Sequence, residues 1–391
     1  MRLLTAPGGT AIAGVLVALA IATSACASSD GPDVFSAEKV GRAGSKLPQL
    51  LPRSRGQTFY VSRQGSNENP GTREQPWLTI QKALDTLTAG ERALVRGGTY
   101  VEDLLMRRAG SPSEPITVSA FPGERVAIRP ASRWGDTYAI EITGSYFRLR
   151  GFVLEGARGS SSTNVYFESG AHDVELSNNE IRFSQDQGIF SERTTRNLHI
   201  IGNRIHDNGV RRVFGQHQSH GIYLEGRNHL IANNVIYGHR HGFGIQVYPE
   251  NRGTVIVHNT VVGSGHSAIV VGGRGGVADI SIRNNILAFN ARYGVQMDSD
   301  CPNGPVRIDR NVIYGNGSGA IESGCSQVRA SGSNVFANPL FISRTERVFQ
   351  VAGRSPAVDR ARRDYSPRMD VISRRRPLGR GYDIGAFERG T

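Results

Sequence analysis

Lysine is nearly missing from this chain: Lys39, Lys46 and Lys82 are the only three in 391 residues. The formal net charge is still +12, so the positive charge of the remaining chain comes from arginine. Arginine is the better bidentate partner for carboxylate, sulfate or phosphate groups. Because export is predicted from the N-terminal residues, we expect a polyanionic glycan rather than a nucleic acid as the partner. A solvated arginine-rich surface without any partner is the alternative.

Hydrophobic runs long enough for a confident membrane span are also missing. The apolar run AIAGVLVALAIA follows Arg2 and precedes small residues, so residues 1–26 are predicted to be a signal peptide. TSAC resembles a lipoprotein processing site that would leave a lipidated Cys26, although the same residues also fit ordinary A-x-A cleavage. The protein is therefore predicted to be exported, as a cell-envelope lipoprotein or a secreted protein. A Ser/Gly/Pro-rich linker is predicted over residues 27–56.

Cysteine is scarce as well. The chain has three cysteines, without a CxxC motif or a Cys/His spacing typical of zinc sites, which excludes an ordinary structural zinc. Cys301 and Cys325 follow corresponding segments of neighbouring repeats. We expect a disulfide between them, since exported proteins keep such bonds, and two buried thiols are the alternative.

What the chain does contain is a repeat. Seven asparagines recur 23 to 31 residues apart, each after a β-type segment and two residues before Val, Ile, Leu or Phe. They are Asn179, Asn203, Asn234, Asn259, Asn285, Asn311 and Asn334. A period of this size indicates stacked units that cannot bury their apolar faces alone. An Asn at one fixed point of each unit suits a turn whose amides hydrogen-bond to the units above and below.

A second set of segments repeats in step with the asparagines and alternates apolar with polar residues. The segments are NVYFE, GIFSE, GIYLE, GIQVY, AIVVG and GVQMD. Such alternation predicts strands with one buried face, and units without a helix predict an all-β, single-stranded right-handed parallel β-helix. We place it at residues 131–340. Residues 57–130 are predicted to form an N-terminal cap with a short helix, and residues 341–391 to close the far end.

The two ends of the chain carry a resemblance. FYVSRQGSNENPGTREQPWLTIQKAL with ERALVRGGTYVE resembles the opening of bacterial β-helix proteins of the pectate-lyase-like superfamily. NPLF, SPAVD and RRPLGRGYDIGAFE resemble their closing segment. The resemblance implies the fold, and an activity among polysaccharide lyases, hydrolases, sugar epimerases and non-catalytic adhesins. A lysine base, used by several such lyases, is excluded here because the coils contain no lysine.

Histidine is concentrated in one part of the repeats. Nine of ten histidines lie between His199 and His266, a region that also holds the longest insertion, residues 207–220. We predict His220 as a base or carboxylate neutraliser and Tyr223 as an acid, with His217 and His241 as further catalytic candidates. Coil-corner histidines bonded to backbone, and tyrosines stacked along the sheet, are the structural alternatives.

Further outward residues of the same strands are candidates for contacts with a substrate. We assign substrate binding to Arg240, Glu225, Gln246 and Tyr248. Glu168, Glu192 and Glu225 are predicted to lie on successive coils, where bare carboxylates would repel each other. Either arginines screen them or a cation such as Ca²⁺ joins them, and the resemblance to calcium-using lyases keeps the cation in view.

These patterns favour an exported enzyme that acts on an acidic, uronate-containing polysaccharide by β-elimination with a His/Tyr pair. The same residues could instead perform C5 epimerisation. A non-catalytic glycan-binding or structural protein of the cell surface is a third reading, and hydrolysis by Glu192 and Glu225 is a fourth. A regular solenoid is predicted to be a monomer.

Overall fold

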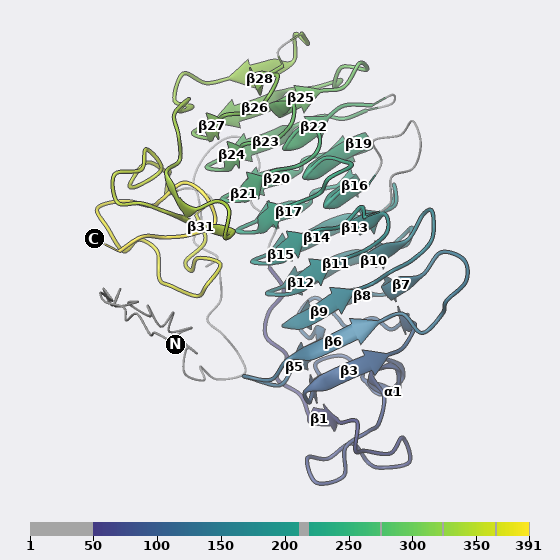
Figure 1. The fold of residues 1–391 in the computed structure, drawn as a ribbon. Helices are drawn as coiled ribbons and strands as arrows, with labels where there is room; N and C mark the ends of the chain where they lie inside the picture. The colour runs from purple at the N-terminus through teal and green to yellow at the C-terminus, as the bar shows by residue number, and fades with distance from the viewer. Residues whose placement is uncertain (1–49, 211–218, 274–275, 323, 364–365, 391) are drawn as a thin grey trace, which may run out of the picture.

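The computed structural model describes residues 50–210, 219–273, 276–322, 324–363 and 366–390. The chain winds into a parallel β-helix whose coils stack along one axis (Figure 1). Most coils contribute one strand to each of three parallel ladders, which we name A, B and C. The predicted all-β solenoid with one short helix is thereby confirmed. The candidate export signal and Cys26 lie outside the described residues.

The strands alternate among the ladders along the chain. Ladder A contains β4 (Leu104–Met106), β7 (Tyr138–Ile142), β10 (Thr163–Phe167), β13 (Gln187–Ser191), β16 (Ile222–Arg227), β19 (Ile245–Arg252), β22 (Ile269–Val271), β25 (Tyr293–Met297) and β28 (Gly319–Ile321). Ladder B contains β1 (Thr58–Val61), β2 (Arg92–Val95), β5 (Ile116–Ala120), β8 (Ser145–Arg150), β11 (His172–Ser177), β14 (Arg196–Ile201), β17 (Leu230–Ala232), β20 (Val255–Val257), β23 (Ile280–Arg283), β26 (Val306–Asp309) and β29 (Val328–Ala330). Ladder C contains β3 (Gly98–Val101), β6 (Val126–Arg129), β9 (Phe152–Glu155), β12 (Glu180–Arg182), β15 (Arg204–His206), β18 (Val235–Tyr237), β21 (Thr260–Val262), β24 (Ile286–Ala288) and β27 (Val312–Tyr314).

The core is a column of aliphatic side chains inside the coils. Alternation along each strand turns one set of side chains inward, and parallel pairing stacks equivalent positions about 4.8 Å apart. One such row in ladder A is fully buried: Ile140, Val165, Ile189, Ile222, Ile245, Ile269 and Val295. The strands of residues 57–130 pair within the same ladders, so the stack begins before residue 131.

The predicted asparagine ladder occupies the turn between ladders B and C. Asn234 donates from its backbone and side-chain amides to Oδ1 of Asn259, both at 2.9 Å. Asn259 donates in the same way to Asn285, at 2.8 and 3.0 Å. The pattern continues unbroken from Asn179 to Asn334. The residue before each of these asparagines from Asn179 to Asn311 has a positive φ, including His258 at 54°.

A second polar row fills the turn between ladders C and A. Asn208, Asn290 and Asn316 accept hydrogen bonds from the coil below, and Ser264 donates to Asn290. His239 occupies the equivalent position, two residues after Tyr237, which pairs with His206 of the coil below and Val262 of the coil above. The side chain of His239 is fully buried. A Cβ on Gly221 would lie 2.6 Å from its Nε2, so this coil tolerates only glycine at Gly221.

Helix α1 (Ile80–Thr86) plugs the first coil. Its inward residues Ile80, Ala83 and Leu84 join the main core, as their spacing predicted. Thr79 is the N-cap and accepts from the Lys82 amide. The Glu102 carboxylate accepts from the first two helical amides at 3.0 and 2.9 Å, which satisfies donors that would otherwise be unpaired.

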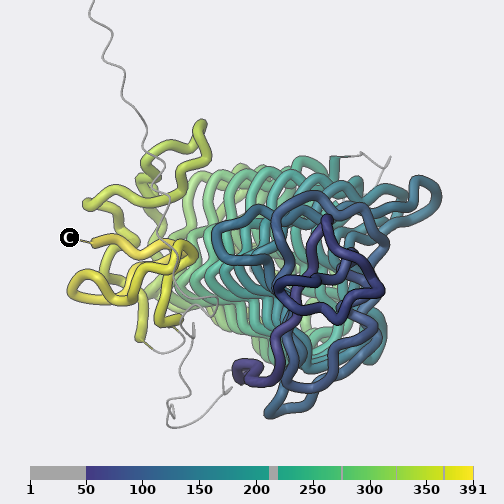
Figure 2. The backbone as a smooth tube through the Cα atoms, turned by 90° about the horizontal axis from the view of Figure 1, so that it is seen from below, coloured from purple at the N-terminus to yellow at the C-terminus, as the bar shows by residue number. Residues whose placement is uncertain are grey.

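The C-terminal segment, described over residues 341–363 and 366–390, is placed differently from the prediction. It does not cover the end of the stack but lies along the flank formed by ladder C and the asparagine turn, beside the middle coils (Figures 1 and 2). We call it the strap. It contains β30 (Phe341–Ser343) and β31 (Val348–Val351), which pair antiparallel. Apolar side chains that ladder C turns outward need a cover there, and the strap supplies it.

The strap is held by buried polar contacts. Arg376 and Glu388 form an ion pair at 2.9 Å in which neither side chain is exposed. Arg376 also donates to Oδ1 of Asn233 at 3.2 Å. Nearer the start of the strap, Arg347 pairs with Asp207 at 2.6 Å.

The disulfide between Cys301 and Cys325 is present, as expected, and joins two neighbouring coils near the far end of the stack. Cys325 packs on the edge of the main core. Within the described ranges, no helix combines the length and apolar character required to cross a membrane.

Candidate functional site

The outward side chains of ladder A form two columns in the register that the alternation predicted. Tyr166 pairs with Phe190, Phe190 with Tyr223, and Tyr223 with Gln246. The rings of Tyr166 and Phe190 lie 5.8 Å apart, and those of Phe190 and Tyr223 lie 5.0 Å apart. Part of the column is thus an aromatic row, the structural alternative for these tyrosines. Its polar ends still face outward beside the second column.

The second column begins with Glu168, Glu192 and Glu225. Glu192 accepts hydrogen bonds from the Tyr166 phenol and from the amide and hydroxyl of Ser169, at 3.1 and 2.5 Å for Ser169. Although burial alone would raise it, these donors hold the pKa of the Glu192 carboxyl below its ordinary value. Glu192 is therefore a charged, fixed carboxylate.

Glu225 lies on the next coil, in a more buried environment. Its carboxylate contacts Nε of Arg193 at 3.3 Å, and its side chain is only 11% exposed. Burial raises the pKa of the Glu225 carboxyl, with Arg193 opposing the shift. Burial, and next the charge of Glu225, raise the pKa of the neighbouring Tyr223 phenol well above its usual range. Tyr223 is consequently a protonated phenol at neutral pH, beside a carboxylate of increased basicity.

His220 is brought to Tyr223, as predicted, but its orientation limits its role. The two rings lie 5.8 Å apart and nearly perpendicular. The backbone N–H of Phe243 donates to Nδ1 of His220 at 3.1 Å, so the proton of the neutral imidazole resides on Nε2. In this tautomer neither ring nitrogen keeps a lone pair that could act as a base, and the side chain is only 2% exposed. The role of His220 as a carboxylate neutraliser stays a prediction.

The other predicted site residues within the described ranges lie on the same face or at the turn that precedes it. Gln246 and Tyr248 follow Tyr223 and Glu225 on the next coil and are half-buried on the same face. His241 is half-buried and Arg240 exposed at the preceding turn. His217 lies outside the described residues.

The three-carboxylate column does not fit a cation site. Glu192 is occupied by Tyr166 and Ser169, and Glu225 by Arg193. Across the part of the chain that is described, no group of three or more His, Cys, Asp or Glu side chains is arranged to hold a metal ion. The arginine contact to Glu225 matches the screening alternative instead, and we derive no step through Ca²⁺.

Two features of this region were missed from the sequence. Asp186 is buried at the turn before β13, where desolvation raises its pKa to about 7. The second is an open hollow of about 410 Å³ at the turn between ladders A and B. Neither feature has a sequence motif. Three arginines of the hollow occupy the same position in successive coils, however, so an alignment of the repeats can identify them.

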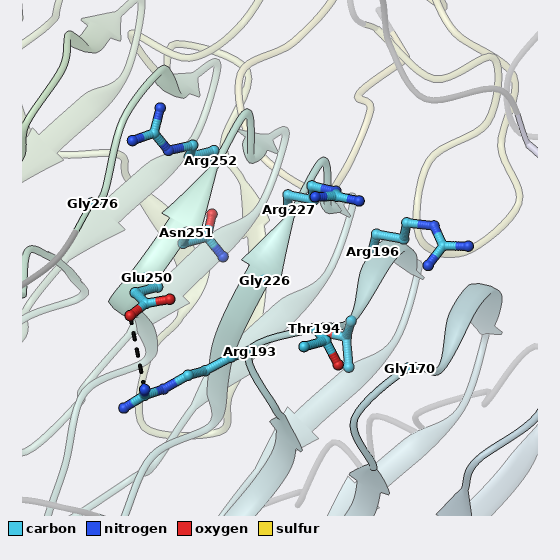
Figure 3. A pocket seen from close by; sticks show the side chains of 11 residues that line it. Gly170, Arg193, Thr194, Arg196, Gly226, Arg227, Glu250, Asn251, Arg252 and Gly276 are labelled. Atoms are coloured by element: carbon cyan, nitrogen blue, oxygen red, sulfur yellow. Dashed lines mark ion pairs between the residues drawn. The ribbon is translucent and has the colours of Figure 1, made fainter.

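The hollow adjoins the Tyr223 region through one side chain. Arg193 contacts Glu225 of ladder A and also approaches Glu250 of the hollow, at 3.8 Å. Arg196, Arg227 and Arg252 complete its basic lining (Figure 3). The site therefore combines an acid, a basic carboxylate and a strongly positive neighbouring surface.

Comparison with known proteins agrees with this architecture. The model of the Pel9A-like right-handed β-helix region matches residues 59–209, and that of the right-handed β-helix region matches residues 163–335. The uncharacterised protein YwoF of Bacillus subtilis is 25% identical over 354 residues, covering 66% of this chain and 75% of YwoF. Pectate lyase PEL9 of Emericella nidulans is 37% identical over 91 residues, covering 23% of this chain and 22% of PEL9.

Solved structures share the fold at low sequence identity. Pectate lyase Pel9A superimposes with a TM-score of 0.65 and 16% identity, covering 86% of this chain and 98% of Pel9A. A rhamnogalacturonan lyase superimposes with a TM-score of 0.54 and 16% identity, covering 74% of this chain and 91% of the lyase. A glycoside hydrolase superimposes with a TM-score of 0.53 and 10% identity, covering 72% of this chain and 96% of the hydrolase. The matched proteins thus include polysaccharide lyases and a hydrolase. Together with the coil architecture, these matches show a right-handed parallel β-helix fold and a similarity to the Pel9A-like β-helix region over residues 59–209.

Proposed function

We propose that this protein cleaves an acidic polysaccharide by β-elimination at a uronate residue bound over Tyr223. The observation that carries the proposal is the Tyr223–Glu225–Arg193 cluster. In it a protonated phenol, a partly buried carboxylate and a cation meet on one face. The polysaccharide lyases among the matched proteins support the reaction class.

Each group of the cluster has a role in the proposed step. Arg193 neutralises the substrate carboxylate, which acidifies the neighbouring C5–H. Glu225 removes that proton, the C4–C5 double bond forms, and the C4–O4 bond breaks. Tyr223 gives its phenol proton to the leaving O4. Glu225 then returns its proton to Tyr223, which restores both groups.

The test is a panel of polyuronates followed by the ultraviolet absorbance of unsaturated uronate and by NMR of the products. We expect one polymer to yield unsaturated ends. Tyr223→Phe should lower kcat by about 10²- to 10⁴-fold, because a general acid is lost. Tyr293→Phe, a half-buried tyrosine elsewhere in ladder A, is the matched control and should retain activity.

Other outcomes would replace the proposal. An inverted C5 configuration without cleavage would indicate an epimerase. Binding of a polymer without any product would leave a non-catalytic glycan-binding protein.

Hydrolysis is a second candidate, because one observation favours it. Glu192 and Glu225 lie on adjacent coils, and their surroundings move their pKa values in opposite directions. Such divergence is typical of an ionised carboxylate paired with a carboxylic acid. In this reading Glu192→Gln abolishes activity and new reducing ends lack unsaturation. In the lyase reading Glu192 only fixes Tyr166, so the same substitution has a modest effect.

A further inference from the structure

The hollow between ladders A and B contains three arginines in direct register. Arg196 pairs across the ladder with Arg227, and Arg227 pairs with Arg252. They occupy one position on three successive coils, and Figure 3 shows them following one another along the edge of the strands. We call these three residues the arginine column. Arg193 lies between the column and Glu225.

The column has no internal neutralisation. Among the described residues, no carboxylate lies within ion-pair distance of Arg196, Arg227 or Arg252. Glu250, the acidic residue of the lining, pairs with Arg193 instead. Four arginines and one glutamate thus leave a formal charge of +3 around a volume of about 410 Å³.

Like charges in direct cross-strand register cost stability. Such contacts are unfavourable, and no acidic side chain within the described lining offsets them. Solvation alone explains isolated surface arginines, but it does not explain three aligned on consecutive coils. In ladder B, by contrast, Arg148 pairs with Glu175 on the next coil at 2.9 Å. A ligand that carries several negative charges would remove the repulsion.

We infer that the arginine column is a subsite for consecutive acidic groups of one polysaccharide chain, next to the cleavage position. The coil spacing of about 4.8 Å is comparable to the length of one pyranose unit, so one acidic group can meet one arginine. The volume falls within the roughly 300–1,000 Å³ typical of small-ligand sites. Guanidinium groups bind carboxylate and sulfate by the same bidentate geometry.

The inference rests on the proposed function for its substrate and specifies it further. A chain lying along the column would have to carry unmasked acidic groups on neighbouring sugars. Polymers with continuous acidic blocks should bind, whereas methyl-esterified ones should not. The charge of the column also predicts that added salt weakens binding.

The experiment measures binding on the full chain carrying Tyr223→Phe, so that the polymer is not consumed. De-esterified polygalacturonate, its methyl ester and dextran sulfate are titrated at two salt concentrations. Arg227→Gln and Arg252→Gln should each raise Kd for polygalacturonate about fivefold, and together more than either alone. Arg307→Gln, an exposed arginine of β26 outside the hollow, should leave Kd unchanged.

A stability measurement separates binding from a structural role. Because each substitution removes a like-charge contact, Arg227→Gln should leave the urea midpoint unchanged or raise it, while affinity falls. Stronger binding of dextran sulfate than of polygalacturonate would assign the acidic group as sulfate. Unchanged affinity in both arginine variants, or a parallel loss of stability and affinity, would overturn the inference.

The outcomes are independent of catalysis. If the wild-type protein cleaves polygalacturonate but the arginine variants bind normally, the subsite is wrong and the proposed function stands. If no polymer is cleaved but affinity depends on the column, the subsite stands and the lyase proposal fails.

Discussion

At the scale of single residues, the clustered histidines illustrate how a chemical signal can be structural. Burial lowers the pKa of His199, His229 and His239 to about 4 in each case, so all three are neutral inside the stack. His239 occupies a rung of the second polar row, where other coils use asparagine or serine. Of the clustered histidines that were predicted to be catalytic, His220 is the one placed against Tyr223.

His239→Asn should flatten the acid dependence of stability. The folded pKa of His239 is depressed, so between pH 6.5 and about 4 the unfolded chain binds a proton that the folded protein does not. Stability contributed by neutral His239 is complete above pH 6.5 and is lost as the pH falls. In this pH range, the free energy of unfolding of the variant should rise relative to that of the wild type by up to about 1.4 kcal/mol for each unit by which the pH falls.

Urea unfolding of both proteins at several pH values checks this expectation. Asp186 and Glu388, whose pKa values burial raises to about 7, titrate with the opposite sign but contribute equally to both proteins. A constant stability difference from pH 7 to pH 4 would contradict the assignment.

At the scale of elements, the asparagine ladder supplies the regular hydrogen bonds that the coil turns need. The side-chain amide of Asn259 donates to the carbonyl oxygen of Ile231 at 2.8 Å. Its Oδ1 accepts hydrogen bonds from the backbone and side-chain N–H groups of Asn234. These groups are buried, so each one left unpaired costs about 1–3 kcal/mol.

Asn259→Ala should therefore reduce the free energy of unfolding by about 3–5 kcal/mol. Asn334→Ala should cost about 1–2 kcal/mol less, because Asn334 ends the ladder and donates to no further asparagine. Equilibrium urea unfolding of the two variants measures the difference. Equal costs would mean that the ladder does not act through buried hydrogen bonds.

Periodic elements are also the ones that could be predicted from the sequence. The column from Tyr166 to Gln246 and the ladder from Asn179 to Asn334 follow directly from spacing, because parallel coils stack equivalent positions. Tautomer and burial do not repeat, so the Phe243 contact that redirects His220 could not be predicted. The arginine column was detectable in principle, but only by aligning turns rather than strands.

At the scale of the whole molecule, the strap shows where periodicity is uninformative. Residues 341–390 carry no repeat, and their partners on the coils are distant in sequence. Arg362 contacts Asn284, 78 positions away, and Arg376 contacts Asn233, 143 positions away. Their outlying position in the sequence suggested an end cap, whereas the apolar flank of ladder C determined where they bind.

Arg376→Ala should destabilise the protein by about 3–5 kcal/mol, because it leaves the buried Glu388 carboxylate without its cation. Arg347→Ala is the control: its side chain is 43% exposed, and loss of the Asp207 pair should cost about 1 kcal/mol or less. Thermal unfolding and limited proteolysis of the strap report the two effects. Equal losses would indicate that the strap is attached mainly at β30 and β31.

The ladder makes the molecule extensible by whole units. Each asparagine of the ladder makes the same hydrogen bonds to its two neighbours. Duplicating one repeat of about 25 residues would therefore add one coil and keep the same hydrogen bonds at both junctions. The strap restricts where this can happen, since its anchors at Asn233 and Asn284 must keep their separation. Evolutionary growth or engineered lengthening of the outward surface of ladder A is thus permitted on either side of those anchors and penalised between them.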